Sequence, residues 1–281
     1  MGLFDFFKKA NENFEQGVKH LEADNYPEAI KYFNEVNPSN KNYNEALIHI
    51  LSSLSALGED EQVIERFAKL PPSIPNYDQA IVDVVGAYIN TGQYEKAFAW
   101  FEKVPSSSSF FSIGVIKYLI ALLRAESPEI YRVECEQAII SFSKLDTSDR
   151  LYLISLKYLL RVLSEYSKFE ELLRYSNVFL EIKKNHPLGL YFKGEALYEL
   201  EKYDTALECL NKIYCDSDEF VDAVYVKALI HEKFGNNEEA QKCWDEVERL
   251  ENLGSPGAMA DESYYGEIVN YKTWIPRKKM V

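Results

Sequence analysis

DNYPEAIKYF, residues 24–33, is a short stretch whose pattern returns further along the chain. GQYEKAFAWF (92–101) and EKYDTALECL (201–210) repeat it: a turn, an aromatic residue, two polar residues, a small alanine, and a bulky residue four places after the alanine. Internal repeats are sought before any other feature, because a missed repeat leads to the wrong fold. The spacing of these copies therefore decides how the rest of the sequence is interpreted.

The small residue of the pattern recurs every 34 residues, with one longer interval of 41 residues. The aligned positions are Ala29, Val63, Ala97, Ala138, Leu172, Ala206 and Ala240. Four places later stand Phe33, Phe67, Phe101, Phe142, Ser176, Leu210 and Trp244, which are bulky in every copy except the fifth. Such a constant register over more than 200 residues predicts seven copies of one structural unit, with a seven-residue insertion in the fourth copy.

Each copy is expected to form two helices joined by a turn. The stretch before each turn has apolar residues at helical spacing. Gly58, Gly92 and Gly235 stand where a left-handed backbone would end the first helix. The small residue in the second stretch lets the two helices approach closely. A single helix pair leaves apolar surface uncovered, so neighbouring pairs must stack. These features predict an all-α solenoid of about seven helix–turn–helix repeats.

This pattern resembles the tetratricopeptide repeat, a family of 34-residue helix–turn–helix units. The resemblance covers about residues 10–252, and it implies a right-handed superhelix. Its best copies are the first, third, sixth and seventh, whereas the fourth and fifth depart most and the family's tryptophan early in the first helix is missing. The matching residues are Gly17, His20, Ala29 and Phe33; Tyr88, Gly92, Tyr94, Ala97 and Phe101; Gly194, Leu197, Tyr203, Ala206 and Leu210; and Ala228, Gly235, Ala240 and Trp244.

Segments outside the repeats divide the chain further. Residues 1–9 are expected to form an N-terminal capping segment, because an end repeat needs its apolar face covered. The insertion lies near residues 124–134, where Pro128 favours a helix break. It is expected to form a longer turn or a longer second helix, or else a protrusion that contacts a partner. Residues 253–260 have the composition of a flexible linker, one that resembles an engineered joint, and residues 261–281 are a tail or a fused peptide.

Composition and charge exclude several classes of function. The net charge of −14 opposes binding to nucleic acid or to an anionic membrane. The four cysteines form no CxxC pair, which favours reduced, structural thiols. There is no signal-peptide pattern and no apolar run long enough to span a membrane. We therefore expect a cytoplasmic protein.

The sequence contains no recognisable catalytic motif. The four histidines are scattered, and no GxSxG, HExxH, P-loop or GxGxxG motif occurs. The sequence therefore predicts no enzymatic activity, no cofactor and no metal site. His20 and His231 occupy the same position of the repeat, and we expect the histidines to be packing or surface residues.

The resemblance implies a concave groove lined by the first helix of each pair. By the family's geometry this groove would be apolar at its N-terminal end, basic in the middle, and rich in tyrosine and acid at its C-terminal end. The apolar residues would be Phe14, Val18 and Leu21, followed by Val82, Gly86 and Ile89. The partner-binding residues would be Lys157, Arg161, Tyr191, Glu195, Tyr198, Glu199, Asp222, Tyr225 and Glu232. Each of these residues could instead belong to the core or to a solvated helix face.

The tail supplies a candidate ligand for this groove. It is either a natural disordered tail or a partner peptide joined to the chain. Its aromatic and cationic residues are Tyr264, Tyr265, Tyr271, Trp274, Arg277, Lys278 and Lys279. The cations could meet the acidic residues of the sixth and seventh repeats.

These features predict a non-enzymatic scaffold that binds an extended peptide or a partner protein. One alternative is an immunity or inhibitor protein, whose acidic surface would suit a basic target such as a toxin. Another is a chaperone for a secreted or assembling client, which would need a wide apolar groove. Family members that hold the carboxylate at the end of a chaperone use Lys and Asn in the first repeats, where this chain has Phe14 and Val18. That type of clamp is not expected here.

Overall fold

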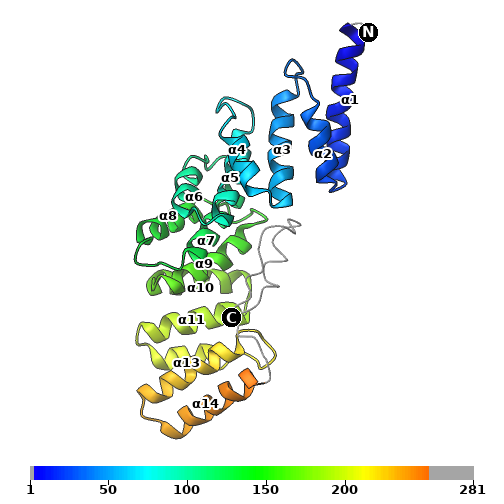
Figure 1. The fold of residues 1–281 in the computed structure, drawn as a ribbon. Helices are drawn as coiled ribbons and strands as arrows, with labels where there is room; N and C mark the ends of the chain where they lie inside the picture. The colour runs from blue at the N-terminus through cyan, green and yellow to red at the C-terminus, as the bar shows by residue number, and fades with distance from the viewer. Residues whose placement is uncertain (1–2, 253–281) are drawn as a thin grey trace. The chain divides into compact units, whose positions relative to one another are not determined.

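A computed structural model describes residues 3–252, and these residues form helices joined by turns (Figure 1). Within this range there are fourteen helices and no strand. Their bounds are α1 Leu3–Glu22, α2 Tyr26–Asn34, α3 Tyr43–Leu57, α4 Asp60–Phe67, α5 Tyr77–Asn90, α6 Tyr94–Phe101, α7 Phe111–Ala125, α8 Arg132–Phe142, α9 Tyr152–Glu165, α10 Phe169–Ile182, α11 Pro187–Glu199, α12 Tyr203–Leu210, α13 Phe220–Lys233 and α14 Asn237–Asn252.

The helices form seven consecutive pairs, as the period predicts. In six pairs the second helix begins three residues before the aligned small residue, at Tyr26, Asp60, Tyr94, Phe169, Tyr203 or Asn237. The small residues of all seven copies are buried, with at most 4% of the surface of any of them exposed. Buried small side chains at one register allow both helices of a pair to pack closely. The predicted repeat register is confirmed.

Each turn inside a pair contains one residue with a left-handed backbone. These residues are Asp24, Gly58, Gly92, Glu126, Ser167, Glu201 and Gly235, with φ between 49° and 73°. They follow the repeat register, and the longer 41-residue interval separates Glu126 from Ser167. The three glycines therefore have the conformation that the sequence predicted for them. The other four turns reach the same conformation without glycine.

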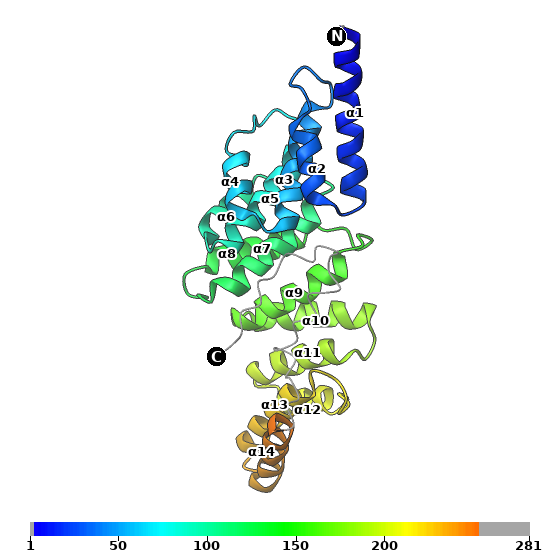
Figure 2. The same cartoon turned by 45° about the vertical axis from the view of Figure 1, so that its right-hand side comes forward.

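The described residues divide into two compact units. Unit 1 contains residues 3–127 and 140–151, and unit 2 contains residues 128–139 and 152–252. In unit 1, α3 packs on α5 and α5 packs on α7. In unit 2, α9 packs on α11 and α11 packs on α13. Figure 2 shows these first helices of successive pairs following one another along each unit. Because they are neighbours, residues at one register of these helices share a face.

The core of each unit is built from the repeated bulky residues. In unit 1, the centroid of the Phe101 ring lies 4.9 Å from the centroid of the Tyr118 ring and 5.8 Å from that of the Phe111 ring. Gly114 of α7 lies against Phe101 so closely that an added Cβ would be 2.7 Å from the ring. Such contacts fix the distance between α6 and α7, because atoms in a close-packed core have no space to move apart.

The connection between α7 and α8 is longer than those inside the other pairs. It contains residues 126–131, whereas the other pairs are joined by two or three residues. Helix α8 also begins six residues before its aligned Ala138 rather than three. Two apolar side chains are exposed here: Ile130 is 71% exposed and Val133 is 76% exposed. The extra residues thus lengthen both the turn and the second helix.

Free thiols occur at four positions with different surroundings. Cys135 of α8 and Cys209 of α12 are buried, Cys243 of α14 is half-buried, and Cys215 is exposed. Burial raises the pKa of the Cys135 thiol to about 12. The buried thiols pack as small apolar side chains.

Candidate partner-binding face

The partner-binding residues expected from the sequence all lie on three helices of unit 2. Lys157 and Arg161 are on α9, four of the residues are on α11, and three are on α13. Their exposure differs: Tyr191 is buried, Glu195 and Tyr198 are half-buried, and Glu199 is exposed. The helices pack in the order α9, α11, α13. The sequence register therefore brings these side chains onto neighbouring helices.

Glu195 is the central polar group of this region. Its Oε1 accepts a hydrogen bond of 2.8 Å from the hydroxyl of Ser164 on α9 and a long one of 3.5 Å from the hydroxyl of Tyr191. Within the described part of the chain, its buried Oε2 has no hydrogen-bond donor. A buried carboxylate oxygen without a donor costs free energy, and such oxygens are rare in folded proteins.

The protonation of Glu195 reflects these surroundings. The pKa of its carboxyl is raised to about 7, chiefly by burial; the negative charges of Glu199 and Asp222 also raise it, whereas the hydrogen bond from Ser164 lowers it. The pKa of Tyr191 is also raised, first by burial and then by the charges of Glu195 and Asp222. Three carboxyl groups from α11 and α13 thus lie close enough to affect one another.

A second group of residues lies beside the first on α13 and α14. Tyr225 is 48% exposed, and its ring meets that of Trp244 edge to face at 5.2 Å. The indole Nε1 of Trp244 donates a hydrogen bond of 2.8 Å to Oε1 of Glu232. The pKa of Tyr198 is raised chiefly by burial. It is raised further by the charges of Glu199, Tyr203, Tyr225 and Glu232, so Tyr198 lies near both groups.

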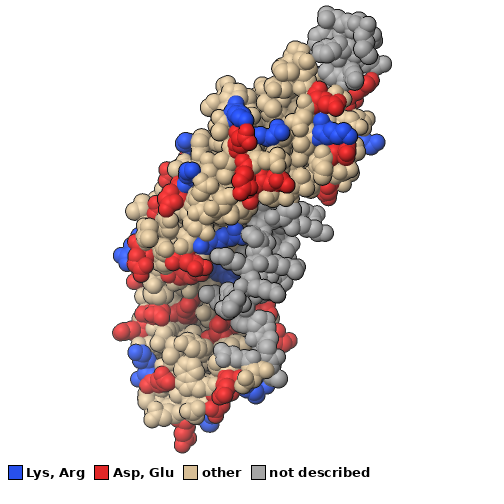
Figure 3. Space-filling model, viewed as in Figure 1, with Lys and Arg blue, Asp and Glu red and all other residues tan. Residues whose placement is uncertain are grey.

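We call this set the acidic face. It comprises Glu195, Tyr198, Glu199, Asp222, Tyr225, Glu232 and Trp244. It combines carboxylates with aromatic side chains, a composition suited to cationic and aromatic ligand groups. Figure 3 shows carboxylates (red) over the part of the surface that the later helices form, with lysines and arginines (blue) between some of them.

The two cations on α9 have a different setting. Lys157 lies near the starts of α11 and α13. Burial lowers the pKa of His186, and the charge of Lys157 lowers it further. The charge of Lys157 also opposes part of the rise in the pKa of Glu219. Glu219 is buried and precedes α13, and burial raises its pKa. Arg161 is half-buried one turn further along α9. Lys157 is therefore close enough to Glu219 for their charges to interact, although the sequence pattern did not point to Glu219.

The apolar part of the expected groove is not found at the predicted positions. Val82 and Ile89 are only 3% and 1% exposed, and Gly86 is buried as well. This prediction was wrong, because these residues pack in the core of unit 1. In the first copy, Phe14, Val18 and Leu21 are half-buried.

Polar residues of α3, α5 and α7 in unit 1 form a network instead. Ser52 donates a 2.7 Å hydrogen bond to Asp83, and Gln79 donates one of 2.9 Å to Ser52. Lys117 is buried, donates to the carbonyl of Val82 at 2.8 Å, and burial lowers its pKa to about 8. Asp83 and Lys117 are 34 residues apart, as are His49 and Asp83. This row of titratable residues at one register is the sequence signal that could have identified the network.

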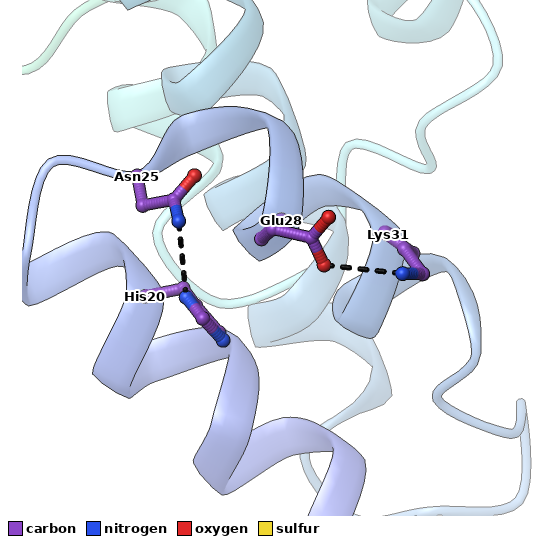
Figure 4. Close-up of polar contacts among 4 residues, drawn as sticks. All are labelled: His20, Asn25, Glu28 and Lys31. Carbon is purple, nitrogen blue, oxygen red and sulfur yellow. Dashed lines mark hydrogen bonds and ion pairs between the residues drawn. The ribbon is translucent and has the colours of Figure 1, made fainter.

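The histidines take part in packing and turn contacts. His20 stacks on Tyr32 at 5.2 Å, and its Nδ1 lies 3.4 Å from the amide nitrogen of Asn25 (Figure 4). The same figure shows the ion pair of Lys31 with Glu28 at 3.2 Å. Within residues 3–252, no group of three His, Cys, Asp or Glu side chains is arranged to hold a metal ion.

The tail residues expected to act as a ligand lie outside the described part of the chain. These are Tyr264, Tyr265, Tyr271, Trp274, Arg277, Lys278 and Lys279. None of the helices in the described range has the length and apolar character needed to span a membrane.

Comparison with known proteins identifies the repeat. The family model for the tetratricopeptide repeat matches residues 85–104, which include the second half of α5 and all of α6. A TPR repeat-containing protein of Methanocaldococcus jannaschii is 43% identical over 56 residues, which are 20% of this chain and 10% of that protein. The chain thus corresponds to only a small part of that relative's length.

Two solved structures share the fold at low sequence identity. A tetratricopeptide repeat protein from Parabacteroides merdae is 10% identical, with a TM-score of 0.52 over 93% of this chain and 98% of that one. The C-terminal part of a TPR repeat-containing protein from Cytophaga hutchinsonii is 12% identical, with a TM-score of 0.56 over 91% and 99%. The fold is therefore an all-α, TPR-like superhelix. One copy of the repeat thus matches the tetratricopeptide model, and the chain shares its fold with tetratricopeptide repeat proteins.

Proposed function

We propose that the chain is a protein-interaction scaffold whose acidic face binds an extended, cation-bearing peptide of a partner protein. The observation that carries this proposal is the buried Oε2 of Glu195, which has no hydrogen-bond donor among the described residues. A lysine or arginine side chain supplies N–H donors and a positive charge, so it would satisfy this oxygen and the neighbouring carboxylates together.

The aromatic residues favour a peptide over a lone cation. Tyr225 presents half of its surface next to Trp244, and Tyr198 lies close enough to Tyr225 and Glu232 to feel their charges. Exposed tyrosine and tryptophan are typical of residues that dominate binding energy at interfaces. A partner segment could therefore place a cation on Glu195 and an apolar or aromatic side chain on Tyr225.

An array of immobilised 12-residue peptides tests this proposal with the full chain. One set of peptides would hold two Lys or Arg and one aromatic residue, and a matched set would hold Glu in place of the cations. We expect the full chain to bind members of the cationic set, and binding to weaken at least tenfold in Glu195→Gln and in Tyr225→Ala. Glu248→Gln, a change at an exposed position of α14, is the matched control and should bind as the wild type does.

Two outcomes would contradict the proposal. One is equal binding of the cationic and the acidic peptides, and the other is unchanged binding by both Glu195→Gln and Tyr225→Ala. Salt provides a further check, because ion pairs at a surface weaken as ionic strength rises. Binding only to a folded basic protein, and to no peptide, would favour the inhibitor alternative instead.

A further inference from the structure

We propose that residues 261–281 of this chain occupy its own acidic face, so that the C-terminal segment competes with partner peptides. This inference rests on the proposed function, because it assigns an occupant and a form of regulation to the same face. Three observations support it: the cations near the end of the segment, the point at which the described structure ends, and the length of the segment.

The end of the segment has the chemistry that the acidic face fits. Residues 271–281 contain four cations and no Asp or Glu: Lys272, Arg277, Lys278 and Lys279. Tyr271 and Trp274 lie among these cations. The face offers the carboxylates of Glu195, Glu199 and Asp222, followed by Glu232 beside an aromatic pair. The segment thus combines cations with aromatic rings, as the face combines carboxylates with aromatic rings.

The described part of the chain ends on a helix that packs against α13, which carries part of the face. The last described helix, α14, ends at Asn252 and packs on α13. Helix α13 carries Asp222, Tyr225 and Glu232, and α11 is its neighbour. Neighbouring helix axes are about 10 Å apart, so the whole face lies within a few helix diameters of the point where the segment starts.

The length of the segment matches this distance. Arg277 is 25 residues beyond Asn252. A flexible chain of that length has a root-mean-square span of roughly 25–30 Å, and helix α13 is about 21 Å long. A tether that spans such a distance gives an effective concentration in the millimolar range, so even weak contacts would keep the segment bound. The composition of residues 253–260, GSPGAM among them, suits a flexible tether.

Charge reversal in the full chain tests the inference. The probe is a fluorescein-labelled synthetic peptide of residues 261–281, and its Kd is measured by fluorescence polarisation. We expect the triple variant Arg277→Glu, Lys278→Glu, Lys279→Glu to bind the probe at least tenfold more tightly than the wild type, because its own segment no longer competes. The matched control Lys144→Glu, Lys183→Glu, Lys184→Glu makes the same charge change at exposed positions and should leave the Kd within twofold of the wild-type value.

The outcomes separate this inference from the proposed function. Equal Kd values for the wild type and the charge-reversed variant, with cationic array peptides still bound, would overturn the inference and leave the proposed function standing. Failure of the full chain and of every variant to bind any cationic peptide would overturn both. A concentration-dependent dimer in light scattering, lost in the charge-reversed variant, would show that the segment binds a second copy and would also overturn the intramolecular arrangement.

Discussion

At the scale of single residues, the turns inside the helix pairs show how one conformation is reached by different side chains. Three of the seven left-handed positions are glycine, whereas Asp24, Glu126, Ser167 and Glu201 adopt the same region with a Cβ. A left-handed backbone costs an L-residue roughly 1–2 kcal/mol. The hydroxyl of Tyr26 donates a 2.8 Å hydrogen bond to the Asp24 side chain, which offsets part of that cost at the first turn.

Glu201→Gly should stabilise the protein. Glu201 is exposed and has φ of 59°, so glycine would remove strain at little loss of contact. We expect the free energy of unfolding to rise by about 0.5–1 kcal/mol, measured by urea denaturation. The reverse change, Gly235→Ala, should lower it by a similar amount because Gly235 has φ of 71°. A destabilised Glu201→Gly variant would show that this carboxylate contributes more than the strain costs.

The charge of Glu195 should make stability depend on pH. Its pKa is about 7 in the folded chain, above the 4.5 that is ordinary for Glu, so the folded state holds a proton that the unfolded state has lost between these values. The contribution of this proton to the free energy of unfolding is therefore fully present below pH 4.5, and it is lost as pH rises through 7. Relative to the wild type, Glu195→Gln should be more stable at pH 8 than at pH 5 by on the order of 2 kcal/mol.

Thermal unfolding at the two pH values measures this difference. Glu248→Gln is again the control, since it removes a carboxylate from an exposed site, and its Tm difference from the wild type should not change with pH. The same Tm difference for Glu195→Gln at pH 5 and at pH 8 would contradict the assignment of a raised pKa to this group.

At the scale of helices, the distance between neighbours depends on the small residues at their contacts. The repeat register predicted where six of the second helices begin, because the aligned position is set by packing within one pair, which is local in sequence. It failed for the face that the first helices present. Val82, Gly86 and Ile89 are buried, while Asp83, one position along, joins the polar network. Which face points inward depends on the angle between successive pairs, and that angle arises from contacts among many residues far apart in sequence.

The residues of the acidic face show the same limit, and their role in binding stays a prediction. Glu195, Tyr198 and Tyr225 were predicted from the register, and the structure places them on neighbouring helices. The hydrogen bonds from Ser164 to Glu195 and from Trp244 to Glu232 were not predicted. Hydrogen bonds between specific atoms need the orientation of side chains, which the period of a repeat does not specify.

Gly114→Ala should separate α6 from α7. The new Cβ would lie 2.7 Å from the Phe101 ring, which is 2% exposed and held by other aromatic rings. We expect the free energy of unfolding to fall by about 1–3 kcal/mol, as for other overpacked cores. The double variant Gly114→Ala, Phe101→Leu should lose less than the sum of the two single losses, because the smaller side chain makes room. Additive losses would place the effect elsewhere than in this contact.

At the scale of the whole molecule, a stack of helix pairs is stabilised mainly through neighbouring pairs. Helix α11 packs on α9, α10, α12 and α13, whereas α14 packs chiefly on α13. An element with neighbours on all sides opens only when several contacts are lost together, whereas an element at an end opens more easily.

Hydrogen exchange should therefore differ between these two helices. We expect amides of α11 to exchange at least tenfold more slowly than those of α14, measured by mass spectrometry on the native full chain. The amides of α9, which packs on both α10 and α11, serve as an internal comparison and should resemble those of α11. Equal protection of α11 and α14 would contradict nearest-neighbour stabilisation within this unit.

Because the four thiols are buried to different extents, they should react with an alkylating reagent at different rates. Only thiolates react quickly with alkylating reagents, so the exposed Cys215 should be modified first, and Cys135, with its pKa of about 12, should react only when its surroundings open. Cys209 and Cys243 lie between these extremes, on different helix pairs. Mass spectrometry would show the order in which the four cysteines are alkylated as the chain is heated. That order would show which helix pairs separate first, without any cysteine being introduced.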